Sequence, residues 1–375
     1  MNSNWQTKKL GEFIKLEYGK PLTESKRISN GLYPVYGANG IKNFSDEFYY
    51  DKLSIIVGRK GSAGKINLTK EKFWPLDVTY FVTFDDKKYD LKFLYNLLDI
   101  LELKKLAKGV KPGINRNDVY SIKVSIPSLQ EQQRIVKILD KVFEKVAKVK
   151  ENTEKNLQNS KELFESYLQS VFANPGKDWE ERSLEKLGKI TSSKRIYKKE
   201  YVKDGIPFYR IKEIKELAHG KDITLELYIS KSRYEEIKNV FGVPIKGDIL
   251  MTAVGTIGEI YVVKKEEEFY FKDGNVLWLK EFDSVDPYFL KFALMSFVEN
   301  IKKLSKGSAY NALTIEKIEQ HRIFIPPATE QKAIVTKLDA LSVETKKLEA
   351  IYKQKLADLE ELKKSVLKKA FNGDL

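Results

Sequence analysis

The side chains best suited to a chemical role lie in short basic turns that also contain aromatic or amide groups. Arginine can contact a guanine edge or a phosphate with two hydrogen bonds, asparagine can pair with adenine, and tyrosine can stack on a base or contact the backbone. We therefore predict that these turns contact nucleic acid. The candidate residues are Tyr36, Asn39, Arg59, Lys60, Lys65, Lys111 and Arg116 in the first half of the chain, and Arg210, Lys212, Lys306, Tyr310 and Asn311 in the second half.

Each of these turns also has an ordinary structural interpretation. Asn39 precedes Gly40, and Asn-Gly is a preferred pair in a tight hairpin turn. Arg59 could be a solvated charge, and the basic residues from Lys108 to Arg116 could belong to a plain surface loop. The sequence alone leaves these alternatives open.

The glycine-rich run from Gly58 to Lys65 lacks the pattern of a nucleotide-binding phosphate loop. Five residues separate Gly58 from Gly64, one more than that loop has. Ile66 follows Lys65, where the loop needs a serine or threonine hydroxyl to bind magnesium. The sequence therefore does not predict an NTPase.

The composition argues against other catalytic chemistries. The 375 residues include no cysteine, and the two histidines, His219 and His321, lie far apart without the spacing of metal ligands. No motif for amino-group methylation, no dinucleotide or methyl-donor fingerprint and no metal-binding carboxylate cluster stands out. We expect no catalytic residue and no metal site in this chain.

The charge balance favours a polyanionic partner. Lysine and arginine outnumber aspartate and glutamate by 67 to 53, which gives a net charge of +14 and an isoelectric point of about 9.3. No uninterrupted apolar stretch reaches the ~18 residues of a transmembrane helix, and the N-terminus lacks an apolar signal core. We expect a cytoplasmic protein that binds nucleic acid and no membrane.

An internal repeat organises the chain. PSLQEQQRIVKILD (127–140) aligns with PPATEQKAIVTKLD (326–339), with seven identities in fourteen positions at an offset of 199. Upstream, IIVGRKGSAGKI (55–66) corresponds to ILMTAVGTIGEI (249–260). Both glycines of Gly-x-x-Gly are kept, whereas Arg59 and Lys60 become Ala253 and Val254. We interpret the glycines as structural and the basic pair as a difference in ligand.

Each repeat ends in a long polar helix with an apolar stripe. Ser128 and Glu131 have the spacing of a capping box at the start of the first helix. The second helix has a heptad stripe at Leu341, Leu348, Tyr352, Leu359, Leu362 and Val366, interrupted by Thr345 and Lys355. The first has a similar stripe at Leu139, Val142, Val146 and Val149, which weakens through Thr153, Asn156 and Ser160 and resumes at Leu163 and Tyr167.

The two helices are each other's simplest packing partners. A helix of about 68 Å cannot bury its own stripe, and the globular segment between the helices must bring the chain back. We predict antiparallel packing with one domain near each end; the alternative is that each helix packs on its own domain.

The sequence thus predicts an α+β fold with pseudo-two-fold duplication. Two mixed α/β domains at 1–127 and 174–326 are each followed by a long helix, at 128–173 and 327–375, and the helices form an antiparallel coiled coil. Expected strands include 53–57, 80–84, 249–252, 260–263 and 276–279, and expected shorter helices are 93–103 and 288–304.

These features together resemble the specificity (S) subunit of type I restriction–modification systems. The resemblance rests on Pro-x3-Glu-Gln-x2-Ile-Val at 127–136 and 326–335, the Trp-x4-Leu runs at Trp5 and Trp179, and the C-terminal KKAFNGDL. It implies a non-catalytic subunit with two target-recognition domains, each reading one half of a split site in double-stranded DNA. The spacer between the half-sites would be set by the two helices.

The resemblance also implies the partners. Two methyltransferase subunits would dock on the helices, where Glu131, Gln132, Glu330 and Gln331 are the expected contact residues, and restriction motor subunits would complete the complex. S-adenosylmethionine, ATP and Mg would then belong to those partners, and no cofactor to this chain. The alternatives are a coiled-coil scaffold without a DNA role and a self-contained DNA-modifying enzyme.

Overall fold

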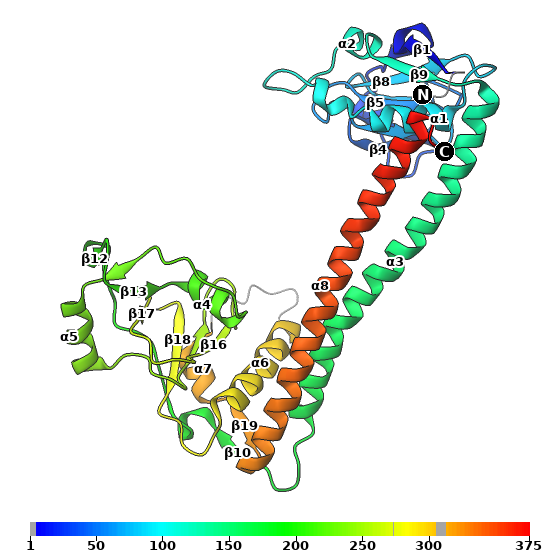
Figure 1. Cartoon of the computed structure of the whole chain (residues 1–375). Coiled ribbons are helices and arrows are strands. Elements are labelled where there is room, and N and C mark those ends of the chain that lie inside the picture. The colour runs from blue at the N-terminus through cyan, green and yellow to red at the C-terminus, as the bar shows by residue number, and fades with distance from the viewer. Residues whose placement is uncertain (1–4, 273, 305–312) are drawn as a thin grey trace. The chain divides into compact units, whose positions relative to one another are not determined.

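The computed structural model describes residues 5–272, 274–304 and 313–375 (Figure 1). The chain forms two compact units: the first contains Met1–Lys155 and Tyr352–Leu375, and the second contains Asn156–Ile351. Each unit combines one mixed α/β domain with the beginning of one long helix and the end of the other. The predicted duplicated α+β fold is confirmed.

The first domain contains a four-stranded sheet in the order β2-β8-β5-β6, a three-stranded sheet in the order β4-β3-β7, and the pair β1-β9. Its elements are β1 (Gln6–Lys9), β2 (Ile14–Tyr18), β3 (Tyr33–Gly37), β4 (Gly40–Ser45), β5 (Ile55–Gly58), β6 (Ile66–Leu68), β7 (Trp74–Pro75), β8 (Thr79–Phe84), α1 (Leu91–Ile100), α2 (Arg116–Tyr120) and β9 (Lys123–Ile126).

The second domain repeats this plan with the sheet β11-β18-β15-β16, the sheet β12-β14-β13-β17 and the pair β10-β19. Its elements are β10 (Glu180–Ser183), β11 (Lys189–Thr191), β12 (Tyr201–Val202), β13 (Ile206–Tyr209), α4 (Ile211–Ala218), β14 (Tyr228–Ile229), α5 (Lys231–Phe241), β15 (Ile249–Thr252), β16 (Ile260–Val262), β17 (Tyr270–Phe271), β18 (Val276–Lys280), α6 (Pro287–Leu304), α7 (Ile315–Glu319) and β19 (Arg322–Ile325). The extra length of the second copy includes α4 and α5.

The two long helices are continuous. The first, α3, spans Leu129–Ala173, and the second, α8, spans Ala328–Asn372. At the start of α3, the Ser128 hydroxyl accepts from the Glu131 backbone N–H at 3.4 Å, while the Glu131 carboxylate binds Arg134 instead of closing the capping box.

Within each unit the beginning of one helix packs beside the end of the other. In the first unit, Phe371 of α8 contacts Phe93 of α1, and Lys150 of α3 pairs with Glu360 of α8 at 2.6 Å. In the second unit, Phe172 of α3 contacts Phe289 of α6, and Leu338 of α8 is buried with Leu168 of α3. The helices are therefore antiparallel in both units, as predicted.

The buried stripe differs from the predicted one. On α8, Leu338, Thr345, Tyr352, Leu359 and Val366 recur every seven residues and are buried or half-buried, whereas Leu348 and Leu362 are exposed. On α3, Thr153, Leu157, Ser160 and Phe164 continue the stripe, and Leu163 and Tyr167 are exposed.

Polar residues are tolerated in the stripe because their hydroxyls bond to their own helix. Thr153 donates to the Val149 carbonyl at 2.7 Å, Ser160 to Leu157 at 2.9 Å and Thr345 to Leu341 at 2.9 Å. The prediction that Leu348, Leu362, Leu163 and Tyr167 lie in the seam was wrong, because it treated these hydroxyl residues as interruptions.

Candidate nucleic-acid interface

Two turns of the first domain are joined by backbone hydrogen bonds into one basic surface. The Gly61 N–H donates to the Pro112 carbonyl at 2.9 Å, and the Ile114 N–H donates to the Arg59 carbonyl at 3.0 Å. The turn from Lys108 to Gly113 is closed by two hydrogen bonds of 3.0 Å between those residues. These backbone hydrogen bonds bring together the two turns that contain four of the predicted contact residues, Arg59, Lys60, Lys111 and Arg116.

Two of these cations lie close to one exposed aromatic ring. The guanidinium groups of Arg59 and Arg116 lie 5.4 and 5.1 Å from the centre of the Tyr18 ring, which is 47% exposed at the end of β2. The Arg59 side chain is held by two hydrogen bonds to the Asp77 carbonyl, at 3.0 and 2.6 Å. An oriented guanidinium beside an exposed ring suits contacts to bases and phosphates.

Tyr18 was missed by the sequence analysis. The alternation along β2 puts Tyr18 on the same face as the buried Ile14 and Leu16, so no local pattern predicts that its ring is exposed at the end of the strand. Beneath it, the Tyr80 hydroxyl donates to the Ile114 carbonyl at 3.2 Å. Burial, followed by the hydrogen bond with Tyr18, raises the pKa of Tyr80 to about 12, so this hydroxyl keeps its proton.

Lys65 and Asn39 form a second part of this surface. The Lys65 ammonium donates to the Asn39 side-chain oxygen at 2.7 Å and to its backbone carbonyl at 3.0 Å. This leaves the Asn39 amide nitrogen free to act as a donor on an exposed turn.

Tyr36 requires a correction. It is only 5% exposed and packs edge-on against Phe73, with ring centres 5.8 Å apart. Burial also raises its pKa. The ring belongs to a small aromatic core and has no surface to offer to DNA.

The second domain has the same glycine turn with different side chains. Gly61 and Gly64 have φ angles of 79° and 78°, and Gly255 and Gly258 have 76° and 82°. The Gly64 N–H bonds to the Gly58 carbonyl at 2.8 Å, and the Gly258 N–H to that of Thr252 at 2.8 Å. The structural role predicted for the glycines is confirmed, because all four lie in the left-handed region that favours glycine.

Arg210 and Lys212 are engaged by carboxylates. Arg210 bonds to the buried Glu213 at 2.7 Å and to Glu226 at 2.8 Å, and Lys212 bonds to Glu226 at 2.7 Å. The hydrogen bonds from Lys212 and Arg210 lower the pKa of Glu226 to about 2. Two cations face two anions here, so this cluster does not form the free basic surface predicted from the sequence. Lys306, Tyr310 and Asn311 lie outside the described residues.

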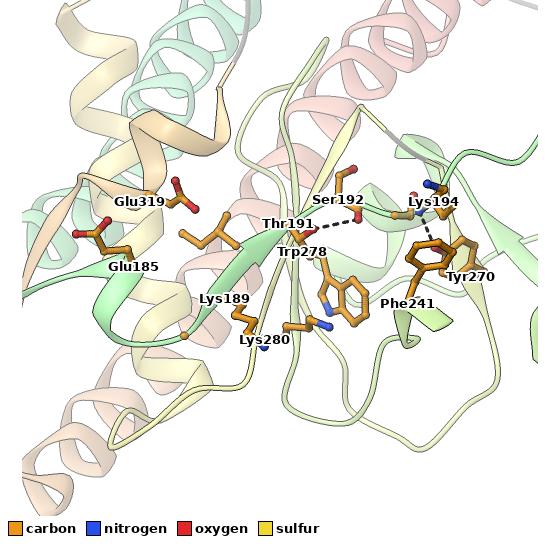
Figure 2. Close-up of a pocket in the computed structure, with 13 residues that line it drawn as sticks. Glu185, Lys189, Thr191, Ser192, Lys194, Phe241, Tyr270, Trp278, Lys280 and Glu319 are labelled. Atoms are coloured by element: carbon orange, nitrogen blue, oxygen red, sulfur yellow. Dashed lines mark hydrogen bonds between the residues drawn. The ribbon is translucent and has the colours of Figure 1, made fainter. Parts of the chain in front are cut away.

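A pocket along β11 brings cations and aromatic rings together in the second domain. Its volume is about 600 Å3. Figure 2 shows Lys280 beside the Trp278 ring, at 4.1 Å, and Lys194 beside Phe241, at 4.7 Å. The Trp278 indole N–H donates to Asp248 at 2.8 Å, which fixes the ring. In the sheet order β11 corresponds to β2, but Trp278 and Lys280 lie on the neighbouring strand β18, so the second domain places its cation and ring beside the equivalent strand rather than on it.

The four residues predicted to bind partners fall into two groups. Gln132 and Gln331 are buried, and each side chain makes three hydrogen bonds inside its own unit. Their side chains are therefore structural and are not available to a partner in this arrangement. Glu131 forms a bidentate pair with Arg134, and Glu330 accepts from the Trp179 indole at 3.1 Å.

No helix within 5–272, 274–304 and 313–375 has the length and apolar character needed to cross a membrane. In the same part of the chain, no group of three or more histidine, aspartate or glutamate side chains is placed to hold a metal ion.

Known proteins similar to this chain share one description. A family profile described as the type I restriction modification DNA specificity domain matches residues 2–159 and 176–360. A putative type I restriction enzyme specificity subunit of Haemophilus influenzae, S.HindORF215P, is 29% identical over 331 residues, covering 85% of this chain and 82% of the relative. The MjaVIII specificity subunit of Methanocaldococcus jannaschii is 25% identical over 412 residues, covering 99% and 93%.

Solved structures support the fold. A chain from a structural study of type I R-M complex assembly and conformational transition has a TM-score of 0.78 at 20% identity, covering 100% of this chain and 99% of that one. The HsdS subunit of Thermoanaerobacter tengcongensis has a TM-score of 0.61 at 20% identity, covering 100% and 98%.

Proposed function

Because this chain belongs to the type I restriction–modification DNA specificity family, we propose that each of its two domains reads one half of a bipartite site in double-stranded DNA. Membership in this family confirms the expected role of a non-catalytic subunit that provides DNA sequence specificity. A scaffold without a DNA role and a self-contained DNA-modifying enzyme are not supported.

One observation supports the proposal that each domain reads its own half-site. The two turns share their left-handed glycines, but the first has the half-buried Arg59 and the exposed Lys60 where the second has the buried Ala253 and the half-buried Val254. Phosphate contacts alone would need no such difference, whereas reading different bases requires different side chains on one scaffold. Each domain therefore contributes its own sequence preference, and the two helices set the spacer.

Subunits of the complex dock on the helices. Exposed apolar residues occur at equivalent positions, 199 residues apart: Val149 and Leu348 are each 37% exposed, and Leu163 and Leu362 are 52% and 46% exposed. The first unit thus presents Val149 and Leu362 and the second presents their equivalents, Leu348 and Leu163, which suits two copies of one methyltransferase subunit. Glu131 and Glu330 are the candidate polar contacts at the helix starts.

The remaining chemistry belongs to the partners. Restriction motor subunits join the same complex, S-adenosylmethionine binds to the methyltransferase, and ATP and Mg bind to the motor subunits. The complex acts in the cytoplasm, where its DNA substrate is accessible.

The experiment tests whether one domain controls one half-site. We would replace Arg59 and Lys60 with the residues of the second copy, as Arg59→Ala and Lys60→Val, and assemble the variant with its methyltransferase. Methylation of a library of randomised duplexes should show altered base preference in one half-site and unchanged preference in the other. Lys9→Ala with Lys87→Ala removes two positive charges elsewhere on the domain and should leave both preferences unchanged. A change in both half-sites, or in neither, would contradict the proposal.

A further inference from the structure

A lysine-lined groove in the first unit adjoins the recognition surface described above and shares Lys65 with it. It has a volume of about 840 Å3 and is formed by the turn at Gly64, the end of α1 and the segment after it, and the last turns of α8. Five lysines line it: Lys65, Lys104, Lys105, Lys364 and Lys368. Asp99 and Glu102 are its two carboxylates.

Most of this positive charge is uncompensated. Glu102 pairs with Lys105, and no described carboxylate forms an ion pair with Lys104, Lys364 or Lys368. The Lys105 hydrogen bond lowers the pKa of Glu102 most, and the charges of Lys364 and Lys368 lower it further. The charges of both α8 lysines therefore act on the Glu102 carboxylate, which lines the same groove.

The second unit contains a partly equivalent groove with a different charge. It lies between the turn at Gly258, α6 and the end of α3, is lined in addition by the first half of α8 and the end of α4, and has a volume of about 320 Å3. Its ionisable lining is Lys161, Lys291, Lys346, Glu165, Glu259 and Glu349, together with His219. Three lysines thus face three glutamates. Glu165 and Glu259 occupy the positions of Lys364 and Lys65.

We propose that the groove of the first unit binds backbone phosphates of the DNA half-site that the first domain reads, so that the end of α8 contacts DNA directly. The inference rests on the proposed function. Lys65 connects the two regions, because it lines the groove and also holds Asn39 on the recognition surface. Lys364 and Lys368 are one helical turn apart, which puts them on one face of α8.

The difference between the two grooves favours DNA over an acidic protein partner. Two copies of one docking subunit would need the same chemistry at both equivalent grooves. The grooves instead differ in charge, so a subunit docked in two copies would meet different chemistry in each unit, and the phosphate contact proposed here belongs to the first unit alone.

The test measures how DNA binding depends on salt. The variant Lys364→Gln with Lys368→Gln, assembled with the methyltransferase, would be compared with the unmodified complex on a duplex that contains the target. Removing one phosphate contact reduces the slope of log K against log salt concentration by about 0.9, so removing two should reduce it by about 2. Base preference at both half-sites should be unchanged, because phosphate contacts carry no sequence information.

A matched variant controls for overall charge. Lys337→Gln with Lys369→Gln removes two exposed charges of α8 that do not line the groove, and it should leave the slope within about 0.5 of the original. An unchanged slope in the groove variant, or an equal change in the control, would overturn the inference. Failure of the groove variant to assemble with the methyltransferase would overturn it too, since the groove would then be a protein contact. Absence of base preference in the unmodified complex would instead refute the proposed function.

Discussion

The side-chain amide of Gln132 accepts a hydrogen bond from the backbone N–H of Asp90 at 2.9 Å. It also donates to the carbonyls of Lys88 and Pro127, at 3.2 and 3.0 Å. Gln331 makes the corresponding three bonds in the second unit, to Asp286 at 2.7 Å, Ser284 at 3.2 Å and Pro326 at 2.9 Å. One buried amide thus ties the start of each long helix to the turn that begins a domain helix.

Replacing this amide should destabilise the first unit. Gln132→Leu keeps the volume but leaves the Asp90 N–H and two carbonyls without partners in a buried site. Each unsatisfied buried group costs about 1–3 kcal/mol, and we expect a total loss of about 3 kcal/mol because water can reach part of the site. Denaturant unfolding of the purified chain, followed by tryptophan fluorescence, would measure the loss.

The neighbouring residue supplies the control for this substitution. Gln133 is exposed at the next helical position, so Gln133→Leu should change stability by less than about 0.5 kcal/mol. If Gln132→Leu left stability intact but abolished methyltransferase binding, the amide would be a partner contact after all.

Tyr18 should support DNA binding through its ring rather than its hydroxyl. Tyr18→Phe keeps the surface between Arg59 and Arg116, and we expect less than a threefold change in affinity. Tyr18→Ser removes the ring from beside both guanidinium groups, while the Asp77 carbonyl still holds Arg59, and should weaken binding of the target duplex about 5- to 30-fold, as expected for ~1–2 kcal/mol. Titration of labelled duplex with the assembled complex at fixed salt would measure both effects; equal affinities for the two variants would rule out a role for the ring.

The repeat allowed most of the fold to be predicted from sequence. The Pro-x3-Glu-Gln-x2-Ile-Val motif identified both helix starts, because its proline and glutamate suit a helix N-terminus. The expected strands near Ile55, Tyr80 and Ile249, and the helix near Tyr288, are confirmed. The motif could not show that its glutamine points inward, because an amide is equally suited to a surface and to a satisfied interior site.

The candidate site was less predictable because burial and ion pairing are tertiary properties. Tyr36 and Tyr18 are the same residue type on neighbouring parts of the sequence, yet one is in the core and the other on the surface. Arg210 stands in a basic run, but Glu226, sixteen residues away, neutralises it. The two turns of the basic surface meet through backbone hydrogen bonds between residues more than fifty positions apart, which no local pattern reveals.

The corrected seam predicts which leucines hold the helices together. Leu359 is buried in the first unit, so Leu359→Asp places a charge in an apolar contact and should cost about 3–5 kcal/mol. Leu348 is exposed, and Leu348→Asp should cost less than about 1 kcal/mol. Thermal unfolding of both variants would compare them directly. Similar losses would show that the stripe predicted from sequence, which contains both leucines, describes the seam better.

His321 should make the second unit sensitive to acid. Its ring stacks on Phe297, with centres 3.7 Å apart, and burial lowers its pKa from 6.5 to about 4. The folded state therefore favours the neutral ring, so stability is fully present above pH 6.5 and falls as the pH drops from about 6.5 towards 4. The free energy of unfolding changes by at most about 1.4 kcal/mol per pH unit, reduced by the water that reaches the partly exposed ring.

His321→Phe keeps an aromatic stack without a titrating group. The difference in unfolding midpoint between this variant and the unmodified chain should grow between pH 6.5 and pH 4.5, and a difference independent of pH would show that the ring is protonated without cost in the folded state.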